Sequence, residues 1–337
     1  MHVTCGDARA GVLVDLGVGV GWDGWVARRW WRELPPAAGS FVMATGIVSV
    51  GLHLTGFEVV SLSGLVLAAV VWLVLVFDFA ERLLRNRSRW LSEADTPPAL
   101  TGIAATTVLG TRLAQLGLLG VAAVLLAAAT LVWPVLLNAV LRQARRRMPG
   151  AVFLVCVSTQ GLAVLAGTLA LAGAGDWLIL ATAVFFSLGL LLYVGALARF
   201  DVAQVWTGAG DQWIATGALA ISALVASKLV AAHQLTGGMH GLLRIVALIV
   251  LGLNLIGYAV LLVAEVLRPR PGYDIRRWAT VFPLGMTAVA ALSTGAAVGV
   301  PALHLLGELL LVVAVGAWAL TFTVLLTDRS TFRPRRA

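Results

Sequence analysis

The chain has 337 residues, of which 60% are hydrophobic and 12% charged, with a formal net charge of +8 and a mean hydropathy of +0.95. Soluble domains carry about a quarter charged residues, so the composition excludes a soluble globular protein and indicates an integral membrane protein. The basic excess falls in short loops between apolar segments, where it sets orientation and gives no reason to expect nucleic acid as a partner. The two cysteines lie far apart, Cys5 in the N-terminal tail and Cys156 within an apolar segment, so they suggest neither a disulfide framework nor a Cys-based metal site.

Ten apolar segments follow one another along the chain, each near the ~20 residues that a spanning helix needs. They cover residues 37–56, 59–82, 98–117, 118–140, 150–172, 176–199, 212–235, 241–265, 279–299 and 302–326. We therefore predict an all-α transporter domain of ten transmembrane helices over residues 34–328. Residues 1–33 are predicted to be a mobile or interfacial cytoplasmic tail, and residues 329–337 a basic cytoplasmic tail.

Arginine placement predicts the orientation of these spans. All but three of the 24 basic residues fall in the two tails and in the loops that follow the even-numbered spans. The exceptions are Arg112, Lys228 and Arg244. By the positive-inside rule, both termini are expected in the cytoplasm, in a multi-pass protein of the plasma membrane.

Odd and even spans differ in composition. Each odd span carries more Gly, Ser, Thr, Asn and Gln than any even span, as "MATGIVSVG" in the first span and "LVLAAVVWLVLVF" in the second illustrate. Small residues allow close helix contact, and hydroxyl groups bond across helices or line a wet path. The simplest arrangement is five hairpins with odd helices inside and even helices outside. The alternative is a solid bundle of tightly packed helices.

A central path would be lined by small and hydroxyl-bearing residues of the odd spans. The residues expected to line it are Thr45, Gly46, Ser49, Thr106, Thr159 and Ser222. Prolines at the cytoplasmic starts of odd spans fit first-turn positions, while Pro283 lies slightly deeper in its span and is expected to kink it.

Two cationic side chains within odd spans are candidates for an anion site, because ionisable residues inside a membrane are usually functional. With a rise of 1.5 Å per residue, Arg112 and Lys228 each lie ~21–22 Å from the cytoplasmic end of their spans. The alternatives are that Lys228 bonds a carbonyl or snorkels outward, and that Arg112 is a loop residue. No catalytic motif, phosphate-binding loop or metal-ligand spacing is present, so we expect neither an enzyme nor a cofactor.

Two stretches carry a resemblance to a known family. "LPPAAGSFVMATGIVSV" in the first span and "RRWATVFPLGMTAVA" in the ninth resemble the voltage-dependent anion channels. This family includes tellurite-resistance permeases, C4-dicarboxylate transporters, fungal malate and sulfite transporters, and plant slow anion channels. The W-x-x-x-F-P-L-G run from Trp278 to Gly285 is the most specific part, and the resemblance covers the chain from about Leu34 to Leu326.

The resemblance implies five helical hairpins around a central pore in each subunit of a homotrimer. It further implies that a phenylalanine of the ninth helix, here Phe282, occludes the pore, with Gly285 leaving space beside it and Pro283 bending its backbone. The expected function is a channel or transporter for small anions such as sulfite, chloride, nitrate or C4-dicarboxylates.

Two other functions remain open on sequence grounds. One is a ten-span, proton-coupled metabolite carrier built from two inverted five-helix repeats, which would not produce the contrast between odd and even spans. The other is a membrane-embedded enzyme, for which the histidines at the outer ends of the spans would be the only candidate catalytic groups.

Overall fold

The computed structural model describes residues 36–85, 94–143, 145–269 and 274–327. The chain divides into two units, Met1–Leu34 and Pro35–Ala337, and the described residues belong to the second. The two predicted tails, 1–33 and 329–337, lie outside them. Where the structure describes the chain, its regular elements are helices joined by turns and loops, with one isolated β-bridge between Met148 and Phe200.

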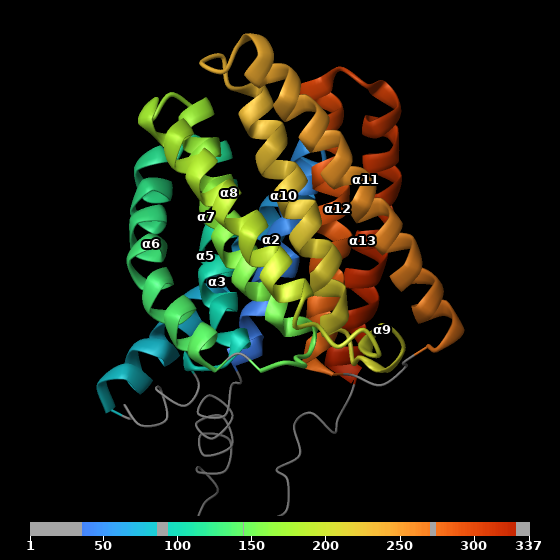
Figure 1. Ribbon diagram of the computed structural model, residues 1–337. Coiled ribbons are helices and arrows are strands. Elements are labelled where there is room, and N and C mark those ends of the chain that lie inside the picture. The colour runs from blue at the N-terminus through green and yellow to red at the C-terminus, as the bar shows by residue number, and fades with distance from the viewer. Residues whose placement is uncertain (1–35, 86–93, 144, 270–273, 328–337) are drawn as a thin grey trace, which may run out of the picture. The chain divides into compact units, whose positions relative to one another are not determined.

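A long helix forms at each of the ten predicted positions (Figure 1). Their bounds are α2 Gly39–Leu54, α3 Glu58–Arg85, α5 Thr101–Gln115, α6 Leu119–Arg142, α7 Leu154–Leu171, α8 Trp177–Leu197, α10 Ile214–Ala231, α11 Gly237–Leu267, α12 Trp278–Val298 and α13 Pro301–Thr327. The all-α prediction is therefore confirmed. A short helix, α9 Gln204–Thr207, lies between α8 and α10.

Eight of these ten helices are long and apolar enough to cross a bilayer, the exceptions being α2 and α5. With 16 and 15 residues, these two are ~22–24 Å long at 1.5 Å per residue, shorter than the ~30 Å hydrocarbon core. Each is preceded by a 3-10 turn that uses residues the sequence analysis had placed in the span. Ten spans thus remain a prediction, although ten helices are observed.

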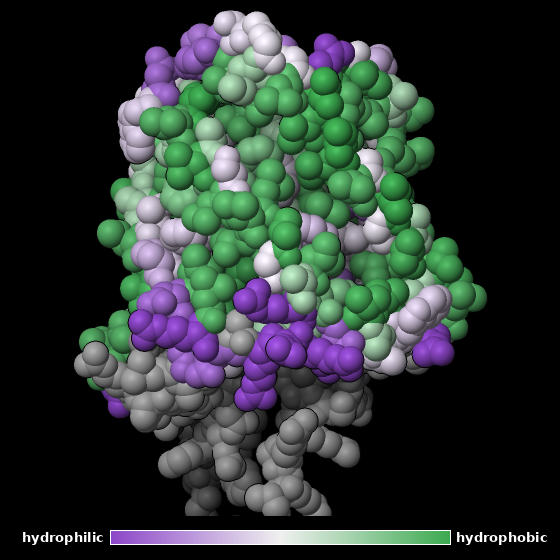
Figure 2. Space-filling view, viewed as in Figure 1, coloured by the Kyte–Doolittle hydropathy of each residue, from purple (hydrophilic) through white to green (hydrophobic). Residues whose placement is uncertain are grey.

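Burial separates the helices into two classes that alternate along the chain. In the segment that contains α7, all of the 18 most apolar consecutive residues are buried. In the segments that contain α10 and α12, 78% and 83% of the corresponding residues are buried. Most residues of α2 and α5 are buried too. In the five other long helices, only 11% to 33% of the residues in the corresponding stretch are buried. Figure 2 shows the result as a broad apolar band with hydrophilic residues at its two ends.

The five buried helices, which we call the inner helices, form a closed ring. Each packs against two others in the order α2, α5, α7, α10, α12 and back to α2. Each inner helix also packs against the exposed helix that follows it in the chain, which we call its outer helix. The helices at the odd-numbered positions therefore lie inside and those at the even-numbered positions outside, as their composition predicts.

Glycines bring the inner helices into close contact around this ring. A Cβ added to Gly46 of α2 would lie 2.8 Å from Val108 Cγ1 of α5. A Cβ on Gly217 of α10 would lie 2.9 Å from Pro283 Cγ, and one on Gly285 would lie 2.9 Å from Ile47 Cγ2. These positions have no room for a side chain, which is how small residues allow membrane helices to approach closely.

We expect Gly46→Leu to destabilise the ring, because the new side chain would collide with Val108. Overpacking of this kind typically costs about 1–3 kcal/mol, so thermal unfolding in detergent should begin several degrees lower. The matched control is Gly102→Leu on α5, where an added Cβ meets no atom within 4 Å. Equal melting temperatures for the two variants would contradict the close contact between α2 and α5.

Candidate functional site

A cavity lies on the axis of the ring, and all five inner helices contribute to its wall. Its lining residues are Ile47, Val50, Thr107, Val108, Thr111, Gly161, Val164, Ile221, Leu224 and Met286. The cavity measures about 10 Å³, roughly the space that one water molecule needs. The structure is therefore closed to a hydrated anion at this level.

The wall of this cavity is apolar except for two threonine hydroxyls. Thr107 donates its hydroxyl proton to the Ala104 carbonyl at 2.9 Å, and Thr111 donates to the Thr107 carbonyl at 2.8 Å. Both donors are thereby engaged by the backbone of their own helix. No residue that lines the cavity is charged or titratable.

Phe282 lies one helical turn before Met286, so the two side chains share a face of α12. Its ring is 1% exposed and reaches towards α10, since a Cβ on Gly217 would lie 3.4 Å from Phe282 Cε1. Phe282 itself is not among the residues that line the cavity. Its position is one turn closer than Met286 to the end at which α12 begins.

Pro283 and Gly285 position the helix that carries Phe282. α12 continues through Pro283 without interruption, and the proline ring fits into the space left by Gly217. Thr287 donates its hydroxyl to the Pro283 carbonyl at 2.9 Å. On the neighbouring side, Gly285 allows α12 to approach Ile47 of α2.

The hydroxyl groups that the sequence placed along the path point elsewhere. Side chains of outer helices bond to four of these hydroxyls, those of Thr45, Ser49, Thr106 and Thr159. The hydroxyl of Ser222 accepts from Gln160 Nε2 of α7 at 3.0 Å. Gly46 packs against α5. None of these six residues lines the cavity.

Three tryptophans make the same hydrogen bond at three places, a role that the sequence analysis missed. The indole of Trp72 (α3) donates to Thr106 (α5) at 2.9 Å. Trp133 (α6) donates to Thr159 (α7) at 3.1 Å, and Trp318 (α13) donates to Thr45 (α2) at 3.0 Å. In each case the outer helix bonds to the next inner helix of the ring.

An amide makes the corresponding bond from a fourth outer helix. Asn254 of α11 donates through Nδ2 to the Thr287 hydroxyl of α12 at 3.1 Å. The sequence signal for the tryptophans was their mid-span position, away from the membrane interfaces where Trp usually lies. A buried indole N–H needs an acceptor.

Arg112 lies near the C-terminal end of α5, where it forms an ion pair with Glu58 of α3. Phe282, by contrast, lies near the N-terminal end of α12. The Arg112 side chain is fully buried, with Nη2 2.5 Å from Glu58 Oε1 and Nε 3.1 Å from the Ser61 hydroxyl. Glu58 also contacts His53 Nδ1 at 2.6 Å. The guanidinium charge is thus balanced by an acid of α3, and Arg112 does not line the cavity.

Lys228 is likewise not among the residues that line the cavity. Its aliphatic stem packs against α7, where a Cβ on Gly167 would lie 3.3 Å from Lys228 Cδ. Within the described part of the chain, its ammonium group makes no hydrogen bond or ion pair. No hydrogen bond or ion pair among the described residues joins Lys228 to Arg112.

The five inner helices all begin at the same end with a 3-10 turn. The turns are η1 Pro36–Ala38, η2 Pro97–Leu100, η3 Gly150–Phe153, η4 Asp211–Trp213 and η5 Ile275–Arg277. η1 contacts η2 and η5, and η3 contacts η2 and η4. Because a helix N-terminus carries a partial positive charge, each inner helix contributes such a charge at this end of the ring.

Two aspartates bond to backbone N–H groups at this end. Asp211 accepts from Ala151 N at 3.2 Å, and Asp274 accepts from Arg276 N at 2.9 Å. The Arg276 guanidinium, 2.7 Å from Asp274, holds the pKa of the Asp274 carboxyl below its usual range. These contacts stabilise the starts of α7 and α12, the helix that carries Phe282.

Comparison with known proteins gives a family match over most of the chain. The family model described as voltage-dependent anion channel matches residues 33–326, which confirms the resemblance seen in the first and ninth spans. No curated protein matches the sequence.

The indole–hydroxyl bonds can be tested by a double-mutant cycle of Trp133→Phe and Thr159→Val, measured by unfolding in detergent or mixed micelles. Polar side-chain bonds between membrane helices have coupling energies of about 0.6 kcal/mol on average, up to ~1.7, and we expect a value in this range. Trp177→Phe with Thr159→Val is the control cycle, since Trp177 is 71% exposed on α8. A zero coupling energy for Trp133 and Thr159 would contradict the bond.

Proposed function

Because the chain belongs to the voltage-dependent anion channel family, whose members are membrane anion channels and transporters, we propose that it passes small anions along the axis of the inner ring. The observation that carries this proposal is the axial cavity to which all five inner helices contribute. We propose sulfite, chloride, nitrate or a C4-dicarboxylate as the permeant ion.

The same family membership supports a finer architecture. We propose five transmembrane hairpins around a pore in each subunit, with both termini in the cytoplasm of a plasma-membrane protein that assembles as a homotrimer. The alternation of buried and exposed helices supports the hairpins, and the distribution of arginines supports the orientation.

Phe282 is the proposed gate of this pore. Its ring lies on the face of α12 that also carries Met286 towards the axis. Movement of the ring away from Gly217 would widen the path without breaking a hydrogen bond, because the ring has none to lose. The apolar wall above it opposes water and ions until it widens, as in gates that close by dewetting.

Selectivity for anions is assigned to the starts of the inner helices. The two intramembrane cations do not face the cavity, and Arg112 is neutralised by Glu58. By contrast, the five N-termini meet at one end of the ring and present partial positive charge to it. The absence of a titratable group among the residues lining the cavity favours uncoupled flux over proton-coupled transport.

Replacing Phe282 by alanine should raise anion flux in proteoliposomes by at least roughly tenfold, which corresponds to a barrier lower by about 1.4 kcal/mol. The measurement is chloride or nitrate efflux, with potassium and sodium flux recorded in parallel to check that cations stay excluded. The control is Phe77→Ala, a phenylalanine of α3 that is 72% exposed. Unchanged flux from a folded Phe282→Ala protein would show that Phe282 only packs against neighbouring helices and does not close the path.

Met286 is expected to form a second closed layer, since it is the residue of α12 that lines the cavity. The Met286→Ala change alone should have little effect while Phe282 closes the path. Combined with Phe282→Ala, it should raise flux severalfold above the single variant. Additive small effects of both changes would argue against two layers in series, and single-channel or efflux recordings separate the two outcomes.

A further inference from the structure

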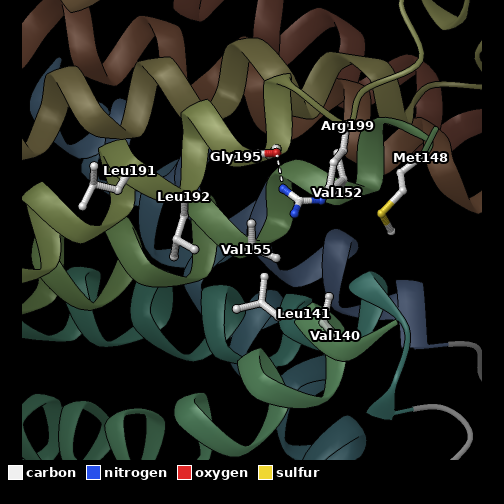
Figure 3. A pocket seen from close by; sticks show the side chains of 10 residues that line it. Val140, Leu141, Met148, Val152, Val155, Leu191, Leu192, Gly195 and Arg199 are labelled. Atoms are coloured by element: carbon white, nitrogen blue, oxygen red, sulfur yellow. Dashed lines mark hydrogen bonds between the residues drawn. The ribbon is translucent and has the colours of Figure 1, made fainter. Parts of the chain in front are cut away.

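A second hollow lies outside the ring, between the outer helices α6 and α8 (Figure 3). It is lined by Val140, Leu141, Met148, Val152, Val155, Leu191, Leu192, Gly195, Ala196 and Arg199. We call it the α6–α8 groove. It lies at the end where the inner helices begin, since Val152 belongs to η3.

The groove has a buried apolar floor and exposed apolar walls. Val140, Val152, Val155 and Ala196 are 2% to 4% exposed, whereas Leu191 is 70% exposed. The groove measures about 80 Å³, well below the ~300 Å³ of a site that encloses a small molecule. An occupant must therefore lie partly outside it, along helices that face the surroundings of the protein.

One charged side chain is built into this apolar groove. Arg199 is exposed and donates through Nη1 to the Gly195 carbonyl at 2.9 Å, which holds the guanidinium over the groove (Figure 3). Gly195 leaves room for it, because the nearest atom to an added Cβ would be Arg199 Nη1 at 3.6 Å. The remaining guanidinium donors have no partner in the part of the chain that the structure describes.

Backbone bonds tie a second basic segment to the same end of the groove. Met148 N donates to the Arg199 carbonyl at 2.8 Å, and Asp201 N donates to the Met148 carbonyl at 3.0 Å. The exposed run Arg145, Arg146 and Arg147 immediately precedes Met148 and is thereby held close to Arg199. The carboxylate of Asp201 accepts from Ala203 N at 3.2 Å.

We propose that the α6–α8 groove binds a phospholipid with an anionic headgroup. An acyl chain would lie against the apolar floor from Ala196 towards Leu191, a distance of about one to two helical turns. The phosphate would meet Arg199 and the arginines before Met148. Basic pockets between membrane helices are a known form of binding site for anionic headgroups. The groove opens on the lipid-facing side of α6 and α8, whose apolar windows are only 22% and 28% buried.

The test is a lipid titration of the full-length protein in detergent, followed by native mass spectrometry. Phosphatidylglycerol and phosphatidylcholine with identical acyl chains are compared, and the anionic lipid should bind more tightly. Arg199→Gln should weaken phosphatidylglycerol binding roughly fivefold and should weaken phosphatidylcholine binding less, because the choline group offsets the charge of its phosphate. Equal binding of the two lipids by the unmodified protein would overturn the proposal.

Two further variants separate charge from shape. Gly195→Leu fills the groove and should weaken binding of both lipids. Arg85→Gln removes an arginine whose side chain is 78% exposed at the end of α3 and should change neither. Equal effects of Arg199→Gln and Arg85→Gln would show that binding depends on general surface charge, contrary to the proposal.

Two other occupants would be recognised in the same experiment. If glycerol phosphate, which has no acyl chain, displaces the lipid and Gly195→Leu has no effect, the groove is a simple anion site and the lipid assignment is wrong. If Gly195→Leu changes the oligomeric state but not lipid binding, the groove is an interface between copies of the chain, and the assignment is wrong as well. Because lipid binding is measured without ion flux, failure here leaves the proposed function untouched.

Discussion

The arrangement of helices depends on one constraint, that a polar group in an apolar surrounding must find its partner inside the protein. In this chain the partner is repeatedly a threonine hydroxyl of an inner helix. Trp72, Trp133 and Trp318 each donate an indole N–H to such a hydroxyl, and Asn254 donates an amide N–H to another. Each bond joins an outer helix to the inner helix next along the ring, so each of these four outer helices is attached to two inner helices, the one before it in the chain and the one it bonds to.

These bonds explain why hydroxyl-rich inner helices enclose an apolar axis. The hydroxyls of Thr45, Thr106 and Thr159 are directed outward to the indoles, while Ile47, Val108 and Val164 remain to line the cavity. Close contacts at three glycines, Gly46, Gly217 and Gly285, then bring the inner helices so near to one another that little space is left along the axis. The proposed permeation therefore requires a movement that widens the ring, and Phe282 lies where α12 contacts α10 near Gly217.

Charge is arranged by the same rule. Arg112 is buried, but its Nη2 bonds to Glu58 and its Nε to Ser61, so these contacts join α5 to α3. Among the described residues, positive character remains at Lys228 within α10, at the helix starts in the η1–η5 turns and, on the outside, at Arg199 beside the α6–α8 groove. The helix starts would thus attract an anion on the axis, whereas Arg199 would attract the headgroup of a lipid in the groove. Both features lie at the end where the inner helices begin.

The sequence alone determined the class of protein, the ten helix positions, the inner and outer sets and the family, because composition and the length of apolar runs report directly on contact with lipid. It could not determine which way each side chain points. In a soluble helix an apolar stripe marks the buried face, but inner helices such as α2 and α7 are surrounded by protein and carry no such stripe. Their rotation is set by packing and by bonds between distant residues, such as Trp318 with Thr45 and Arg112 with Glu58. Only the tertiary structure therefore decided that these hydroxyls and this arginine serve helix contacts, and that Met286 lies at the axis.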